Sequence, residues 1–252
     1  MSELILVTDD GAVRTVRMNR PEKKNALTFA MYDALAAAVE GAQEAPSIRC
    51  ILLAGSPTDF CAGNDIGNFA QTTSTDEEKP RPSRRFMHAL ARNEKPLVGA
   101  VQGNAVGIGA TMLLHCDHVV ASSEVRIAAP FVGLGILPEA GSTLIGPRLM
   151  GHARAFSLLV MGRPLTAQDA KAAGIVNTVV PPAEVEAEAM KAAQQIAALP
   201  ADGVLTARRL LRGSRDELID RIDEEATLIH ARLSSPEARA AFEAFLSRKK
   251  TP

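Results

Sequence analysis

Three short, almost wholly apolar runs limit the possible folds of this sequence more than any other feature. They occupy residues 50–55, 96–101 and 119–122. Runs of this length and composition are typical of strands that are buried on both faces of a parallel sheet. A helical pattern over about residues 84–92 separates the first two runs. Strand–helix–strand repeats indicate βαβ units, so the sequence predicts an α/β fold with a mostly parallel sheet.

The N-terminal part predicts a hairpin, a loop and a helix. Residues 4–7 and 13–18 alternate around a short polar turn, which is the pattern of an antiparallel hairpin. Residues 19–25 are polar and contain a proline, which indicates a loop. Thr28 then provides an N-cap for a helix that continues to about residue 45.

The C-terminal part differs because strands almost disappear after about residue 150. One short strand is predicted near 175–180, and helices are predicted over 151–161, 167–172, 183–198, 202–211, 215–232 and 236–248. We therefore divide the chain into an α/β core of residues 1–195 and a helical region of residues 196–252. Helices that leave a core bury little of their own surface, so we expect this region to pack on a partner subunit.

Composition argues against several classes of function. The formal net charge is -1, and the chain has one Tyr and no Trp, so neither charge nor stacking surfaces favour nucleic-acid binding. Three scattered Cys argue against a disulfide framework and predict a cytoplasmic protein. The N-terminus lacks a basic segment followed by a long apolar run, so we expect neither a signal peptide nor a membrane span. No His, Cys or acidic residues have the spacing of a metal site.

Two glycine-containing turns are the first candidates for a functional site. They cover residues 60–66 and 103–110, and each lies near the end of a predicted strand, before a predicted helix start. A helix start presents free main-chain N–H groups, and two such groups aimed at one point form an oxyanion hole. The glycines have a second explanation, because glycine also permits tight turns and close packing without any chemistry. Spacing alone does not decide between the two.

Further short motifs accompany these turns in a definite order along the chain. The series is Asn19-Arg20-Pro21, Asn25-Ala26-Leu27, Phe60-Cys61-Ala62-Gly63-Asn64-Asp65, the segment 103–109, Cys116-Asp117, Leu134-Gly135-Ile136-Leu137-Pro138, Gly162-Arg163-Pro164-Leu165-Thr166-Ala167 and Ala173-Gly174-Ile175-Val176-Asn177. In combination these motifs resemble the crotonase superfamily, the family of enoyl-CoA hydratases and isomerases. The resemblance covers nearly the whole chain. It implies a crotonase-like ββα spiral core, a helical C-terminal trimerisation region, a homotrimer or dimer of trimers, and acyl-CoA thioester substrates.

The resemblance also implies a site. The main-chain N–H groups of Asn64 and Ile108 would form the oxyanion hole, and backbone donors need no particular side chain. Arg20, Lys23 and Lys24 are suitable cations for phosphates, although solvated loop charges are an equally good explanation for each. No separate cofactor is implied, because coenzyme A is part of the substrate. The other positions implied around the CoA thioester are Lys24, Ala26, Ala62, Gly63, Asp65, Ile66, Gly107, Gly109, Phe131 and His88.

The expected reaction depends on where the chain departs from the family pattern. Hydratases of this family use two glutamates to hold and split a water molecule, and this chain has Thr111 and Phe131 at those positions. Neither side chain can act as a carboxylate base. Glu139 stands where peroxisomal-type Δ3,Δ2-enoyl-CoA isomerases carry a catalytic glutamate. Its apolar neighbours favour burial, which raises a carboxyl pKa toward the range of proton transfer. The other explanation is a charge near a helix start at Gly141.

The resemblance therefore implies an enoyl-CoA isomerase of fatty-acid or related acyl-CoA catabolism, in which Glu139 moves a proton from C2 to C4 of a 3-enoyl-CoA. An enoyl-CoA hydratase with an atypical pocket and a non-catalytic CoA-binding trimer are the alternatives. Aryl-CoA dehalogenation is a third, because related chlorobenzoyl-CoA dehalogenases carry a histidine near the place of His88 and an aspartate at that of Glu139. Those enzymes also use a Trp, which this chain lacks. A surface or core position equally explains His88.

Overall fold

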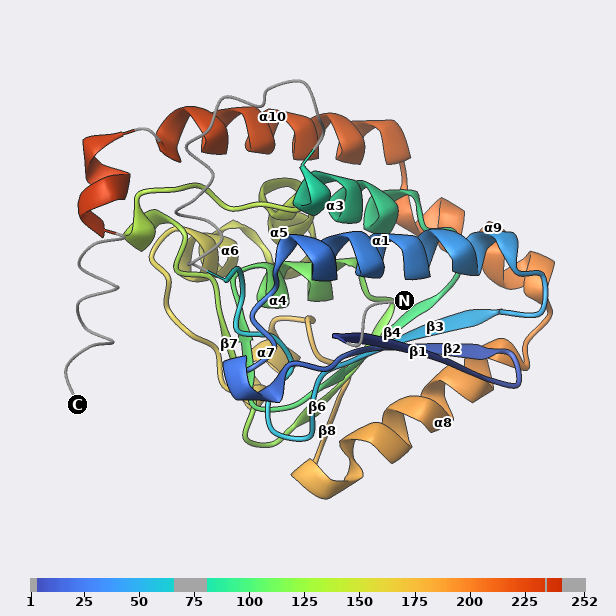
Figure 1. The fold of residues 1–252 in the computed structure, drawn as a ribbon. Helices are drawn as coiled ribbons and strands as arrows, with labels where there is room; N and C mark the ends of the chain where they lie inside the picture. Colours follow the sequence, from blue (N-terminus) through green and yellow to red (C-terminus); the bar gives the residue numbers. More distant parts are fainter. Residues whose placement is uncertain (1–3, 66–80, 234, 242–252) are drawn as a thin grey trace.

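A six-stranded sheet lies at the centre of the molecule (Figure 1). The computed structural model describes residues 4–65, 81–233 and 235–241. The strands, in their order across the sheet, are β1 (Ile5–Asp10), β2 (Val13–Met18), β3 (Cys50–Ala54), β4 (Leu97–Val101), β6 (His118–Ser122) and β8 (Thr178–Val180). The β1–β2 hairpin is antiparallel and the other neighbours are parallel. The predictions of a hairpin and a mostly parallel sheet are confirmed.

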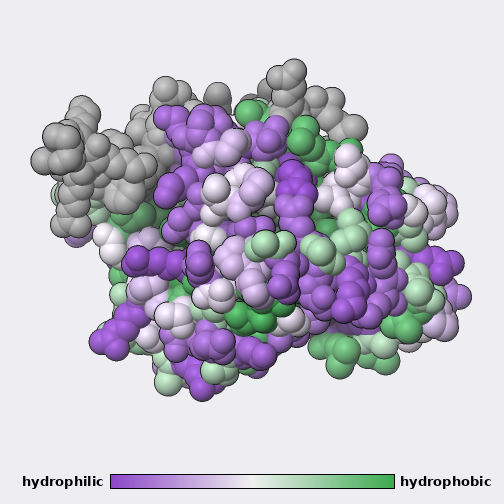
Figure 2. All heavy atoms as spheres, turned by 90° about the horizontal axis from the view of Figure 1, so that it is seen from below, coloured by the Kyte–Doolittle hydropathy of each residue, from purple (hydrophilic) through white to green (hydrophobic). Residues whose placement is uncertain are grey.

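The apolar runs are explained by helices on both faces of this sheet. On one side, α1 (Phe29–Glu44) and α3 (Pro82–Arg92) pack together, and α8 (Val185–Ala197) covers the other side (Figure 1). Alternate residues of β3 point to the two sides, so every side chain of the strand is buried. Polar residues cover most of the face seen from below, with small apolar patches between them (Figure 2).

A second, two-stranded sheet lies next to the glycine turns. It pairs β5 (Asn104–Val106) with β7 (Arg126–Ala128) in parallel. The sequence did not predict either strand, because three residues are too few for a periodic pattern to stand out. Directly after β5, the chain forms α4 (Ile108–Thr111) and the 3-10 helix η2 (Met112–His115). The remaining short 3-10 helices are η1 (Pro21–Lys23), η3 (Val132–Leu134) and η4 (Pro182–Glu184).

Helices dominate the C-terminal half, as predicted, with different boundaries. They are α5 (Ser142–Met150), α6 (His152–Leu159), α7 (Ala167–Ala172), α9 (Ala201–Arg212) and α10 (Arg215–Leu233). The helix predicted over 151–161 ends earlier, at Leu159, and a left-handed Gly151 separates it from α5. Residues 236–241 are helical, and the rest of the helix predicted over 236–248 lies outside the described residues.

The C-terminal helices contact other helices of their own chain, and the expectation that they also pack on a partner subunit stays a prediction. Helix α10 runs along α3 and also contacts α5 (Figure 1), and its Ile222 is buried in the main core. Helix α9, in contrast, leaves Leu210 and Leu211 largely exposed. The division between residues 1–195 and 196–252 stays a prediction.

Candidate active site

The two glycine turns predicted from sequence lie against each other. Cys61 forms a parallel bridge with Ala105, and its carbonyl accepts a hydrogen bond from Val106 N–H at 2.8 Å. A Cβ atom at Gly109 would lie only 2.5 Å from the carbonyl oxygen of Cys61. Position 109 therefore needs glycine for close packing, which was one of the two explanations considered for these glycines.

The same contact brings together the two main-chain segments that carry the predicted oxyanion donors. Gly107 has a φ of 59° and forms the N-cap of α4, so Ile108 is the first residue of that helix. Asn64 follows the first turn and bridges to Leu27. Within the part of the chain that the structure describes, neither the N–H of Asn64 nor that of Ile108 donates to another protein group. Both N–H groups are thus available to an external acceptor.

The loop before α1 fixes the first turn from the other side. The buried side chain of Asn25 donates hydrogen bonds to the carbonyls of Asp59 and Phe60, at 2.7 and 3.1 Å. Ala62 N–H donates to the Lys24 carbonyl at 2.9 Å. Asn25 and Lys24 both have positive φ angles of 57° and 50°, a strained geometry of the kind that often occurs at functional sites.

The cationic side chains of the loop before α1 differ in their contacts. Arg20 forms a 2.7 Å ion pair with Asp65 and donates to the Ala26 carbonyl at 2.9 Å. Arg20 and Asp65 therefore hold the turn, and the Arg20 guanidinium is already engaged. Lys23 and Lys24 are exposed to solvent. Of the three predicted phosphate cations, these two are the accessible ones.

Glu139 lies in a buried, strained turn. Only 8% of its surface is exposed, and the next two residues, Ala140 and Gly141, have φ angles of 65° and 69°. A non-glycine residue at positive φ is uncommon and costs about 1 kcal/mol. Burial raises the pKa of Glu139 to about 7, the nearby Glu225 adds to the rise, and a hydrogen bond from Asn64 opposes it.

A chain of hydrogen bonds orients Glu139. The buried Tyr32 hydroxyl donates a short hydrogen bond to Asn64 Oδ1. Because the amide oxygen is engaged by Tyr32, the amide nitrogen of Asn64 is the group that donates to Glu139. Glu139 Oε1 has no hydrogen-bond partner among the described residues. One carboxyl oxygen is therefore held, and the other is available for chemistry.

Two further side chains hold the turn that carries Glu139. Glu225, from α10, accepts hydrogen bonds from the N–H groups of Gly141 and Thr143 at 2.7 and 3.0 Å. Burial lowers the pKa of His115 to about 3, so the neutral ring donates from Nε2 to the Ala140 carbonyl at 2.7 Å. Helix α5 does begin after Gly141, but Glu225 provides the carboxylate at its N-terminus, not Glu139.

Sequence reasoning missed Tyr32, Glu225 and the role of the Asn64 side chain. Tyr32 belongs to an amphipathic helix where an aromatic residue looks like ordinary core. Glu225 is one acid among several in α10, and it meets Gly141 across 84 residues of chain. No local pattern marks either one. Its burial, which only the structure reveals, distinguishes Glu225 from the exposed acids of α10.

Several other predicted positions have contacts of their own. A Cβ atom at Gly107 would lie 3.9 Å from the ring of Phe131, and the Thr111 hydroxyl bonds back to the Gly107 carbonyl at 3.3 Å. His88 forms a 2.7 Å contact with Asp223 that joins α3 to α10, and within the described residues no hydrogen bond or ion pair connects it to Glu139. Ile66 lies outside the described residues.

A cavity of about 580 Å³ lies elsewhere, between the end of α3 and the junction of α9 and α10. Arg208, Arg212 and Arg215 contribute to its walls, whereas Glu139 and the two glycine turns do not. Its position away from the oriented carboxyl group makes it a poor candidate for the chemistry. Among the helices that the structure describes, none combines the length and apolar character needed to cross a membrane.

Comparison with known proteins places this geometry in a family. The sequence matches the enoyl-CoA hydratase/isomerase family over residues 8–252. The chain belongs to this family. A solved enoyl-CoA hydratase/isomerase structure from Pseudoalteromonas atlantica T6c superposes with a TM-score of 0.93, at 37% identity and 98% coverage of both chains. The predicted crotonase-like α/β fold with a helical C-terminal region is thereby confirmed.

The curated relatives of this enoyl-CoA hydratase/isomerase family member include both isomerases and hydratases by name. It is 35% identical to enoyl-CoA delta isomerase 2 of Rattus norvegicus over 98% of its own length, and it spans 64% of that relative. It is 30% identical to 1,2-epoxyphenylacetyl-CoA isomerase of Escherichia coli K12, with 99% and 97% of the two chains covered. A probable enoyl-CoA hydratase of Rhizobium meliloti is 29% identical. These names differ in the reaction, so the choice between reactions depends on the site.

Proposed function

We propose that this enzyme is a Δ3,Δ2-enoyl-CoA isomerase with Glu139 as its acid–base residue. The observation that carries the proposal is the state of Glu139: it is buried, Asn64 holds one of its oxygens, and the other has no partner. Thr111 and Phe131 occupy the positions where hydratases of the family use glutamates. A single oriented carboxyl group suits a proton shuttle better than the addition of water.

The proposed reaction begins at the two free amides. The thioester carbonyl of a 3-enoyl-CoA accepts hydrogen bonds from the N–H groups of Asn64 and Ile108. Glu139 Oε1 removes a proton from C2, and the electrons of the C–H bond pass into a dienolate whose charge lies largely on the carbonyl oxygen. One oxyanion donor contributes about 3 kcal/mol to such a step. Glu139 then returns the proton to C4, which gives the 2-trans-enoyl-CoA.

The pKa of Glu139 suits both halves of this shuttle. A carboxyl group with a pKa of about 7 is a stronger base than an ordinary glutamate and still gives up its proton readily near neutral pH. Tyr32 and Asn64 hold the group in place, which limits the motion that would separate it from C2.

We propose further that the loop and turn residues bind the coenzyme A portion of the substrate. The exposed Lys23 and Lys24 are placed to meet phosphates, while Arg20 and Asp65 keep the loop in shape. The other proposed contacts are Ala26, Ala62, Gly63, Gly107, Gly109 and Phe131. We also propose a homotrimer or dimer of trimers, supported by the exposed Leu210 and Leu211 of α9.

Glu139→Gln tests the function directly. We expect kcat for 3-enoyl-CoA isomerisation to fall by about 10³-fold, because the amide cannot accept the C2 proton. The exposed Glu124→Gln is the matched control and should keep the wild-type rate. Exchange of C2 protons for deuterium should fall in parallel with isomerisation.

Two results would favour the alternatives. Rapid hydration of crotonyl-CoA by the wild-type enzyme, without isomerisation of 3-enoyl-CoA, would identify a hydratase. Binding of acyl-CoA with neither reaction and no C2 exchange would identify a non-catalytic CoA-binding protein.

A further inference from the structure

Glu225 is a second buried carboxylate beside the proposed acid–base residue. It lies on α10 with 4% of its surface exposed. Its Oε2 accepts from Gly141 N–H at 2.7 Å, and its Oε1 accepts from the N–H and the hydroxyl of Thr143, at 3.0 and 2.6 Å. Three donors from one short segment fix this side chain against the turn that carries Glu139. The proposed mechanism does not use Glu225.

The contacts of the two carboxyl groups decide which of them ionises first. Burial raises the pKa of Glu225, but its three hydrogen bonds and Arg221 on the same helix oppose the rise by favouring the charged form. Glu139 accepts a hydrogen bond from Asn64 and has one oxygen without a partner. Hydrogen bonds to a carboxylate favour its ionised form, so Glu225 loses its proton before Glu139 does. The charge on Glu225 then makes ionisation of Glu139 less favourable, which raises the pKa of Glu139.

Three other titratable side chains near this turn are neutral. Burial raises the pKa of Tyr32 and brings that of Cys61 to about 12, and it lowers the pKa of His115 to about 3. Arg221 donates to the Thr143 hydroxyl at 3.2 Å and pairs with Glu224 at 3.0 Å, so this cation also lies beside the segment that Glu225 holds. Among the described residues, Glu225 is therefore the negative charge that acts on Glu139.

We propose that Glu225 is a positioning residue for the isomerase, which holds the Glu139 turn through its main-chain donors and places a negative charge beside the acid–base carboxyl group. This inference rests on the proposed function. Its consequence is that a residue of the C-terminal helix α10 sets the pH range in which the core residue Glu139 works as a base.

Glu225→Gln tests this role by the pH profile. The substitution removes a negative charge, so Glu139 ionises more easily and its base form persists at lower pH. We expect the acidic limb of the kcat/KM profile to move to lower pH by roughly one unit. Glu224→Gln removes a charge from the next residue of the same helix and is the matched control, with an unmoved limb. A uniform loss of rate with an unmoved limb in Glu225→Gln would leave a structural role and overturn the proposal.

A titration without substrate separates this inference from the proposed function. The wild-type protein and the variants Glu139→Gln and Glu225→Gln are labelled with ¹³C. The carboxyl resonance that is missing in each variant is assigned to the substituted residue, and both resonances are then titrated in the wild-type protein. We expect Glu225 to titrate at lower pH than Glu139, and the reverse order would overturn the proposal without any need for the variant to stay active. A wild-type enzyme that fails to isomerise 3-enoyl-CoA would overturn the proposed function, whereas the order of titration would still decide the effect of Glu225 on Glu139.

Discussion

Tyr32 decides which atom of the Asn64 amide faces Glu139. The oxygen and nitrogen of an amide have nearly the same shape, so a hydrogen-bond partner must select the orientation. The hydroxyl of Tyr32 does this by donating to Asn64 Oδ1. Without that donor, the amide could turn its oxygen toward the Glu139 carboxylate, and two acceptors would face each other.

Tyr32→Phe should therefore slow the proposed isomerisation while leaving the fold intact. We expect kcat to fall by about tenfold, with KM little changed, because one orienting hydrogen bond contributes about 1–2 kcal/mol. The measurement is a steady-state assay, with circular dichroism during urea unfolding as the check on stability, since the chain has no Trp to follow. An unchanged kcat would mean that packing alone orients Asn64.

At the residue scale, the sequence predicts Glu139 as a candidate site residue but does not predict the side chains that surround it. Glu139 stands out because an acid among apolar residues has to be explained, and the structure does bury it. The surroundings of Glu139 come from α1 and α10, which reach it only through tertiary packing. His88 shows the opposite case, because its place in the sequence fitted a pocket, a surface or a core position, and in the structure it contacts Asp223.

The element that matters most to the site is the contact between α4 and the first glycine turn. The strands β5 and β7 hold the start of α4, and the Gly109 backbone passes close to Cys61. Long periodic segments such as α1 and the buried strands were predictable because many residues repeat one signal. The sheet of β5 and β7 was not, because its three-residue strands are defined by their partner and not by their own pattern.

Gly109→Ala should separate the two turns. The new Cβ would lie 2.5 Å from a backbone oxygen, which cannot move without shifting the turn, so we expect a loss of about 1–3 kcal/mol of unfolding free energy. Activity should fall more than stability, because the two segments that carry the proposed oxyanion donors, the N–H groups of Asn64 and Ile108, would move apart. Gly203→Ala in α9 is the control: nothing lies within 4 Å of its Cβ position, and alanine there should stabilise the helix by about 0.5–1 kcal/mol. Wild-type activity in Gly109→Ala would show that the turns adapt.

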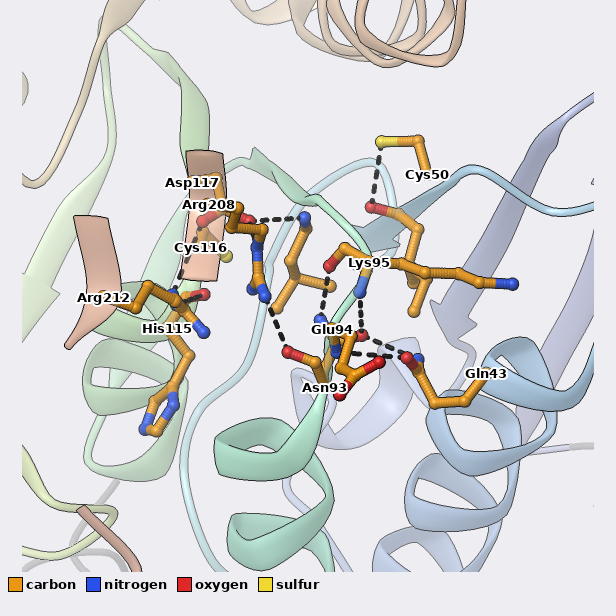
Figure 3. A network of polar contacts seen from close by, with 12 residues as sticks. Gln43, Cys50, Asn93, Glu94, Lys95, His115, Cys116, Asp117, Arg208 and Arg212 are labelled. Atoms are coloured by element: carbon orange, nitrogen blue, oxygen red, sulfur yellow. Dashed lines mark hydrogen bonds and ion pairs between the residues drawn. The ribbon is translucent and has the colours of Figure 1, made fainter. Parts of the chain in front are cut away.

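In the whole molecule, a buried ion-pair network joins the C-terminal helices to the sheet. Arg208 of α9 donates to Asp117 at 2.7 Å and to the Asn93 carbonyl at 2.6 Å, and Arg212 bonds to the His115 carbonyl (Figure 3). Asp117 also accepts from Leu97 N–H of β4 at 2.8 Å. Because His115 supports the Glu139 turn and Glu225 reaches it from α10, the helical region is part of the site and not a separate appendage.

Asp117→Asn should destabilise the whole enzyme. Arg208 has 7% of its surface exposed, and removing its partner leaves a charge that water cannot reach. Breaking one side of a buried pair costs about 3–5 kcal/mol, so the urea midpoint followed by circular dichroism should fall steeply. Glu217→Gln breaks the exposed pair with Arg148 and should change stability by less than about 1 kcal/mol. Arg208 and Arg212 join α9 to Asp117, Asn93 and His115. We therefore expect α9, the η2 segment with His115 and the Glu139 turn to loosen together, and kcat to fall at urea concentrations below the main unfolding transition. Equal effects of the two substitutions would show that water reaches Arg208 and that the network does not join the helices to the site.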